Sequence, residues 1–251
     1  MTAPAPSVLV FAGLDPSGGA GLAADVLALA AQGAHALPVA TALTVQDNNR
    51  VHAVAPVDSA FVLRQARALL ETCDIRAVKI GIPGSRANAL AIAAVLEQLR
   101  ARDPLLPVVL DPVLASGHGD RLAEDDPVQA LAELLPLATI ALPNAPEACA
   151  LADFPAAQLL VTGGHGDGQF VTNRWFVEGR LQRHWRWPRL DGAFHGSGCT
   201  LAAALAGRLA LGEGMFEALG AAQAYCHAAL AQAFAVAPGQ RIPRRFLSDI
   251  I

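Results

Sequence analysis

The residues best suited to chemistry lie in the run His-Gly-Ser-Gly-Cys-Thr at 195–200, directly before an Ala- and Leu-rich stretch typical of a helix. The first N–H groups of a helix have no partner within it, and glycines leave them uncovered. Gly196, Ser197 and Gly198 are therefore predicted to form an anion hole for a phosphoryl group in transfer. The helix dipole is predicted to lower the pKa of Cys199, so that its thiolate accepts a proton from a substrate hydroxyl. Equally open is a structural interpretation, with Cys199 as a small buried filler and Ser197 as a cap.

Oxygen-bearing side chains follow two predicted strands. Asp111 ends the apolar run at 108–111, and Asn144 and Glu147 follow the run at 139–142. Carboxylates suit Mg²⁺, which proteins bind through one or two such groups together with substrate phosphates. The Asn-x-x-Glu spacing also fits a helix N-cap with its capping-box partner, and both interpretations are compatible.

Two further polar segments follow strands near the N-terminus. The glycine-rich run at 13–21 leads into a helix that carries Asp25, and its backbone can approach an anion or a polar ring closely. An ordinary turn capped by Asp15 or Ser17 is the alternative. Gln46 can both donate to and accept from the edge of a heterocycle, although a solvated turn explains the same polar run.

The elements that must position these residues alternate between short β-branched runs and longer helical stretches, which predicts repeated βαβ units and an α/β fold. Strands are predicted at 8–12, 36–44, 77–81, 108–111, 139–142 and 159–162, and helices at 20–31, 59–71, 86–101, 127–134, 198–211 and 215–234. A glycine-rich turn at 164–168 predicts antiparallel strands at 169–177 and 181–187, added to the edge of a mostly parallel sheet. Residues 1–251 are expected to form a single domain.

Composition excludes several classes of function. The 251 residues carry 18 Lys and Arg against 22 Asp and Glu, a net charge of −4, so neither nucleic acid nor a membrane surface is the expected partner. The N-terminal residues lack the basic region of a signal peptide, which favours the cytoplasm. The four cysteines are far apart and predict neither a disulfide framework nor a zinc site. Lys79 is the only lysine and no P-loop motif occurs, so backbone N–H groups, arginines or a metal must hold any phosphate.

Seven segments occur in one order that resembles the hydroxymethylpyrimidine/phosphomethylpyrimidine kinase family. They are AGLDPSGGAG at 12–21, TALTVQ at 41–46, KIG at 79–81, LDPV at 110–113, PNAPEA at 143–148, GGH at 163–165 and HGSGCT at 195–200. The resemblance runs from about Val8 to Phe234. It implies a ribokinase-like three-layer sandwich, a homodimer, and ATP and Mg²⁺ as cofactors. The implied activity is phosphorylation of 4-amino-5-hydroxymethyl-2-methylpyrimidine, its monophosphate, or both, in thiamine biosynthesis.

The resemblance also assigns roles to individual residues. Those implied to bind the pyrimidine substrate are Gly13, Asp15, Asp25, Gln46 and Gly81. Those implied to bind the nucleotide are Asn144, Thr162 and Gly164, with Asp111 and Glu147 serving the metal. The implied catalytic residues are Gly196, Ser197 and Gly198 in the anion hole and Cys199, which stands where other superfamily members place an aspartate base.

Three departures from the family pattern bear on these roles. Thr162 stands where a lysine is usual, which removes one positive phosphate contact. Residues 151–158 are too few to hold the further helix that relatives have there, so either the sheet edge is trimmed or the nucleotide side is remodelled. Ile82 replaces a common methionine and alters the shape of the pocket. These departures leave open a catalytically weak or silent pyrimidine-binding regulatory protein, and the cysteine motif also fits a pyridoxal-type vitamer kinase.

Overall fold

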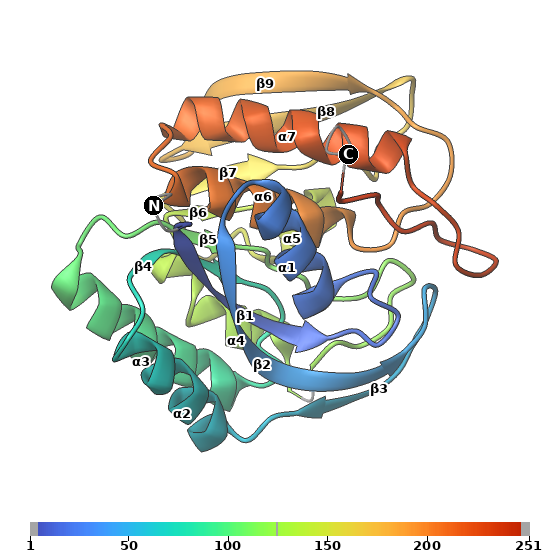
Figure 1. The fold of residues 1–251 in the computed structure, drawn as a ribbon. Helices are drawn as coiled ribbons and strands as arrows, with labels where there is room; N and C mark the ends of the chain where they lie inside the picture. The colour runs from blue at the N-terminus through green and yellow to red at the C-terminus, as the bar shows by residue number, and fades with distance from the viewer. Residues whose placement is uncertain (1–4, 124, 247–251) are drawn as a thin grey trace.

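The computed structural model describes residues 5–123 and 125–246, which build one nine-stranded sheet in the order β3-β2-β1-β4-β5-β6-β7-β8-β9 (Figure 1). The strands are β1 Ser7–Leu14, β2 His35–Gln46, β3 Val51–Pro56, β4 Ile75–Ile80, β5 Val108–Leu110, β6 Ile140–Ala141, β7 Gln158–Val161, β8 Phe170–Val177 and β9 Arg180–Pro188. The six central strands, which lie in the order β2-β1-β4-β5-β6-β7, pair in parallel. The antiparallel strands lie at the edges, β3 at one edge and β8 and β9 at the other.

Helices cover both faces of the sheet and bury two apolar cores. The helices are α1 Gly21–Ala31, α2 Ser59–Leu70, α3 Arg86–Arg102, α4 Pro127–Ala132, α5 Ala145–Ala150, α6 Ser197–Ala210 and α7 Met215–Ala231. One core lies between the sheet and α1, α6 and α7, and the other lies between the sheet and α2, α3 and α4 (Figure 1). Because both faces are covered, the central strands are apolar throughout, as in β1, where 8–12 are all buried. The predicted ribokinase-like sandwich with an antiparallel edge is confirmed.

The hairpin of β2 and β3 was missed from the sequence. The predicted strand at 36–44 continues to Gln46, turns through Asp47, whose N–H donates to the Arg50 carbonyl at 3.1 Å, and returns as β3. The run at 51–56 alternates small side chains and ends in proline, so its apolar signal is weak. As a result Gln46 lies on a strand rather than in a solvated turn.

Two predicted helix ends also differ. The helix predicted at 127–134 ends at Ala132 and is followed by a 3₁₀ turn at Leu135–Leu137, because Pro136 cannot continue an α-helix. The helix predicted at 215–234 ends at Ala231, after which Phe234 pairs with Ile242 in an isolated bridge. No helix in the described segments is long and apolar enough to cross a membrane.

The short connection before β7 leaves the sheet edge intact. From α5, residues 151–157 lead to β7 without a further helix, and β7, β8 and β9 are all present. The strands β6 and β7 pair over few residues: Ala141 lies opposite Leu159, and one isolated bridge joins Asn144 to Thr162. The edge of the sheet is therefore not trimmed.

Candidate active site

One cavity of about 560 Å³ collects the predicted site residues at the carboxyl ends of the parallel strands. Thirteen of the fourteen line it, all but Asp25: Gly13, Asp15, Gln46, Gly81, Asp111, Asn144, Glu147, Thr162, Gly164, Gly196, Ser197, Gly198 and Cys199. Strand ends meet at one edge of a parallel sheet, so segments distant in sequence converge there. The predicted convergence is confirmed.

The start of α6 opens onto this cavity. Gly196 is the N-cap of α6 with φ +78°, and the Thr200 hydroxyl donates to its carbonyl at 2.7 Å. A Cβ at position 196 would lie 2.0 Å from the Gly19 carbonyl oxygen, so only glycine fits between the two loops. Gly198 is exposed, which leaves the first turn of α6 open to an anion.

The expected lowering of the Cys199 pKa is wrong. Burial raises the pKa of the Cys199 thiol to about 12, and the positive charge of Lys79 only partly opposes it. The helix dipole is a weaker influence here than desolvation of a thiolate. The thiol is therefore protonated at neutral pH in the ligand-free protein.

Asp25 lies beneath the cavity floor rather than on it. Both Asp25 and Lys79 are 0% exposed, and the Lys79 ammonium donates to the Asp25 carboxylate at 2.8 Å. Burial raises the pKa of Asp25 to about 6 against the pull of Lys79, so the pair is ionised at neutral pH. Lys79 itself lines the cavity. Asp25 is thus the one predicted site residue that the structure places off the cavity wall, paired with Lys79.

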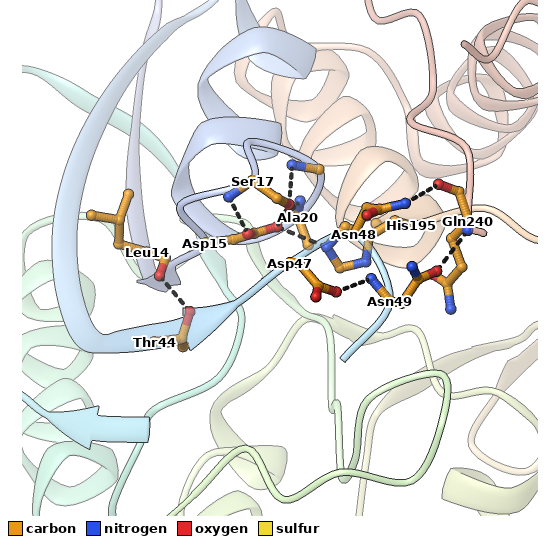
Figure 2. A network of polar contacts seen from close by, with 12 residues as sticks. Leu14, Asp15, Ser17, Ala20, Thr44, Asp47, Asn48, Asn49, His195 and Gln240 are labelled. Carbon is orange, nitrogen blue, oxygen red and sulfur yellow. Dashed lines mark hydrogen bonds and ion pairs between the residues drawn. The ribbon is translucent and has the colours of Figure 1, made fainter. Parts of the chain in front are cut away.

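Asp15 organises the loop after β1. Its carboxylate accepts hydrogen bonds from the Ser17 amide at 2.7 Å and hydroxyl at 2.9 Å and from the Ala20 amide at 2.7 Å, and it contacts His195 Nε2 at 2.8 Å (Figure 2). Burial alone would raise the pKa of Asp15, but these bonds and one with Gln46 outweigh it and lower the pKa to about 2. Asp15 therefore holds the glycine-rich loop against the start of α6.

Asp111 and Glu147 present carboxylates at the ends of β5 and β6. Asp111 Oδ2 is buried without a hydrogen-bond partner among the described residues, and burial raises the pKa of this carboxyl. Glu147 completes the predicted capping box with Asn144: its carboxylate accepts from the backbone N–H of Asn144 at 2.8 Å. Burial raises the pKa of Glu147 to about 7, and the negative charge of Asp111 adds to this. An unpartnered carboxylate oxygen and a second carboxylate suit Mg²⁺, which keeps water and phosphate oxygens as its other ligands.

The end of the cavity beside Thr162 and Gly164 is held by an arginine that sequence reasoning missed. Arg189 follows β9, lines the cavity, and donates to the carbonyl oxygens of Gly164, Gly166 and Gly168 at 3.0, 2.6 and 2.7 Å. This guanidinium fixes the turn after β7 and supplies positive charge beside Thr162.

Two other cations of the site were also missed. Lys79 could have been suspected because it is the only lysine in the chain and stands inside an apolar strand. Arg245 is 2% exposed and contacts the Gly19 and Gly196 carbonyls, yet no nearby motif marks it.

A ribokinase-like phosphotransferase is the class that this sandwich, with its anion-binding helix start and neighbouring carboxylates, defines. The chain matches the family described as phosphomethylpyrimidine kinase over residues 15–243, and it belongs to that family.

Individual relatives agree with this assignment. A hydroxymethylpyrimidine/phosphomethylpyrimidine kinase of Rhizobium meliloti is 38% identical over 92% of this chain and 93% of its own. The Escherichia coli protein of the same name is 33% identical over 94% and 95%. A phosphomethylpyrimidine kinase structure from Clostridium difficile is 28% identical with a TM-score of 0.72, covering 89% and 98%. A Bacillus subtilis pyridoxal kinase in complex with ADP shares the fold at a TM-score of 0.84 and 24% identity, covering 96% and 98%.

Proposed function

We propose that this protein transfers the γ-phosphoryl group of ATP to 4-amino-5-hydroxymethyl-2-methylpyrimidine, to its monophosphate, or to both, in thiamine biosynthesis. The observation that carries the proposal is the open start of α6 on the same cavity wall as the carboxylates of Asp111 and Glu147. Phosphoryl transfer depends on holding two substrates in line and stabilising negative charge, and these groups suit both tasks.

The pyrimidine is proposed to lie between β1, β2 and β4. Gly13 and Gly81 line the cavity where a side chain would not fit, since a Cβ at Gly13 would lie 2.7 Å from Ile82 and one at Gly81 would lie 3.0 Å from the Lys79 ammonium. The Gln46 amide can both donate to and accept from the ring edge. Asp15 is proposed to act here through the loop that it holds, because its oxygens already accept hydrogen bonds from the protein.

The nucleotide is proposed to lie along Asn144, Thr162 and Gly164, with Arg189 beside its phosphates. Asp111 and Glu147 would hold Mg²⁺, which neutralises phosphate charge when bound. The remaining positive charge at this end comes from this chain's own Arg189 and from the amides of the turn at 163–168.

Cys199 is proposed to orient the substrate hydroxyl. With its pKa raised, the neutral thiol is a hydrogen-bond partner at neutral pH rather than a base. A loose transition state requires little removal of the hydroxyl proton before the phosphoryl group is transferred, so a neutral thiol that only orients the hydroxyl suffices at this position.

The test is ATP consumption by the purified protein with Mg²⁺ and, in separate reactions, the pyrimidine alcohol, its monophosphate and pyridoxal. Turnover of either pyrimidine in preference to pyridoxal is expected. No ATP consumption with either pyrimidine would overturn the proposal, and tight pyrimidine binding without nucleotide binding would then indicate a regulatory protein. Preference for pyridoxal would move the substrate to the vitamer class.

We also propose that residues 1–251 act in the cytoplasm as one kinase domain and form a homodimer. Thr44 and Gln46 line the cavity, so the alternate residues Leu43 and Val45 face away from it, and these are 52% and 61% exposed. Two exposed apolar side chains on the same face of β2 support burial against a second copy. Analytical ultracentrifugation should show a dimer that Val45→Lys converts to a monomer, and a monomeric native protein would contradict this part.

A further inference from the structure

The segment that follows α7 returns to the active site. It contacts the turn at 47–50 and, through Arg245, the two loops that contain Gly19 and Gly196. Asn48 donates from its side-chain amide to the Gln240 carbonyl at 3.0 Å, and the Gln240 amide donates to Asn49 Oδ1 at 2.9 Å (Figure 2). Further along, the Tyr225 hydroxyl donates to the Arg245 carbonyl at 2.7 Å. These bonds hold the backbone of this segment and carry the Arg245 side chain into the interior.

The Arg245 guanidinium joins the two loops that flank the anion hole. Its Nη2 donates to the Gly19 carbonyl and, at 3.5 Å, to the Gly196 carbonyl, while its Nε donates to the Thr200 hydroxyl at 3.0 Å. Thr200 in turn donates to the Gly196 carbonyl at 2.7 Å. The Gly196 carbonyl therefore accepts from three donors: the Thr200 hydroxyl, the Thr200 backbone N–H at 3.0 Å and the Arg245 guanidinium.

The orientation of one peptide group follows from these contacts. A trans peptide holds its C=O and N–H in opposite directions, so a Gly196 carbonyl fixed toward Arg245 directs the Ser197 N–H away from it. The peptide after Gly19 obeys the same rule, since its carbonyl meets Arg245 while the Ala20 N–H donates to Asp15. One carbonyl from each loop is thus bonded to the same guanidinium.

Arg245 also carries a charge that no ion pair neutralises within the described part of the chain. It is 2% exposed, and no described carboxylate lies within 4 Å of it. A buried cation without a carboxylate is costly unless it is solvated by other groups, here carbonyl and hydroxyl oxygens. Its field acts through the Gly196–Ser197 peptide on the place where a phosphoryl anion would sit.

We propose that Arg245 is a positioning residue for the anion hole, orienting the Gly196–Ser197 peptide and placing a buried positive charge behind the transferred phosphoryl group. This inference rests on the proposed function and adds a residue to it. A role limited to holding the chain segment in place would affect stability and both substrates alike, whereas a role in the anion hole affects the transition state above all.

The test compares Arg245→Met and Arg245→Lys with Arg244→Met, a matched control. Arg244 is the adjacent residue, but it is exposed and lies over the Phe234 ring instead of entering the site. The measurements are kcat, KM for each substrate, and the affinities for ADP alone and for ADP with Mg²⁺ and aluminium fluoride, which mimics a phosphoryl group in transfer. Thr200→Val, which removes the acceptor for Arg245 Nε, serves if Arg245→Met does not fold.

Arg245→Met is expected to lower kcat about 100-fold and to weaken binding of the aluminium fluoride complex by a similar factor, with ADP affinity changed less than about threefold. Arg245→Lys should keep more of the kcat and more of the aluminium fluoride affinity than Arg245→Met. Thr200→Val should lose about tenfold in each quantity, and Arg244→Met should match the native protein.

Equal losses in ADP and aluminium fluoride binding, or a native kcat in Arg245→Met, would overturn the inference. If the native protein itself turned over neither pyrimidine, the proposed function would fail, and the ratio of the two affinities would still judge Arg245 separately.

Discussion

The two ends of the cavity are built in opposite ways. At the proposed anion-hole end, the long elements β1, α1 and the 14-residue α6 meet. Asp15 bonds to His195, and Arg245 bonds to the carbonyls of Gly19 and Gly196. At the proposed nucleotide end, the elements are short: the two-residue β6, the six-residue α5 and the four-residue β7. Arg189 holds the turn that follows β7. The comparison teaches that one end depends on short elements held by a single arginine, whereas the other end is cross-linked among long elements.

The largest effect is expected from Lys79→Met, which removes the cation paired with Asp25. Breaking a buried ion pair by deleting one partner costs about 3–5 kcal/mol. The buried Asp25 then binds a proton that the unfolded chain releases, so the loss should grow as pH rises from 5 to 8. Urea denaturation at both pH values measures it, with the exposed Arg76→Met on the same strand as control. Unchanged stability at pH 8 would show that the anion-hole end is less tightly built than we describe.

Gly196→Ala should disrupt the proposed anion hole at the start of α6 by a steric clash. The new methyl group would meet the Gly19 carbonyl at 2.0 Å in a backbone conformation that favours glycine, and we expect kcat to fall about 100-fold or more. Gly212→Ala is the matched control, because Gly212 also has a positive φ, +88°, but open space around it. Steady-state kinetics of both variants decide the matter, and equal losses would attribute the effect to backbone strain alone.

At the nucleotide end, Arg189→Gln should raise the KM for ATP about tenfold and change kcat much less. The substitution removes a positive charge and the bonds to three carbonyl groups of the turn. Adding Thr162→Lys to the Arg189→Gln variant should restore part of the affinity for ATP if the lost positive charge causes the effect. Arg186→Gln, which removes an exposed arginine lying over Phe170, should leave KM unchanged. A purely kcat effect would argue that Arg189 serves the other end.

The smallest effect is expected in the pH dependence set by Glu147. With a pKa of about 7, this carboxyl is mostly protonated at pH 6, and binding of Mg-ATP through the ionised form should weaken about tenfold there relative to pH 8. Glu147→Gln keeps the capping box but should abolish that dependence while binding weakly at every pH. Isothermal titration across this range checks it, with the Glu133→Gln variant as control. A native protein whose affinity is flat with pH would contradict the assignment.

Sequence reasoning reached furthest where a motif sits at a strand end. Asp111, Asn144 and Gly196 were placed correctly because parallel strands bring their carboxyl ends together whatever the connections between them. The resemblance to a kinase family supplied the roles of these residues, which spacing alone left open. Asp25 was misplaced because its helix position does not reveal that Lys79, 54 residues later, takes its carboxylate.

Other features had no local signal. The strand β3 has small alternating residues at a sheet edge, and its pairing with β2 depends on the turn chemistry at 47–50 rather than on apolarity. The Cys199 pKa depends on burial, which three-dimensional packing decides. Arg245 acts on loops that only the complete fold brings near it.

The bond between Arg245 and Gly19 spans 226 residues of sequence. During synthesis on the ribosome, the loop that contains Gly19 is made early. Its partner Arg245 is added only when almost all of the described chain has been synthesised. Contacts of such separation close late because a long loop must first be brought together. The nascent protein should thus acquire its sheet well before it acquires catalytic competence.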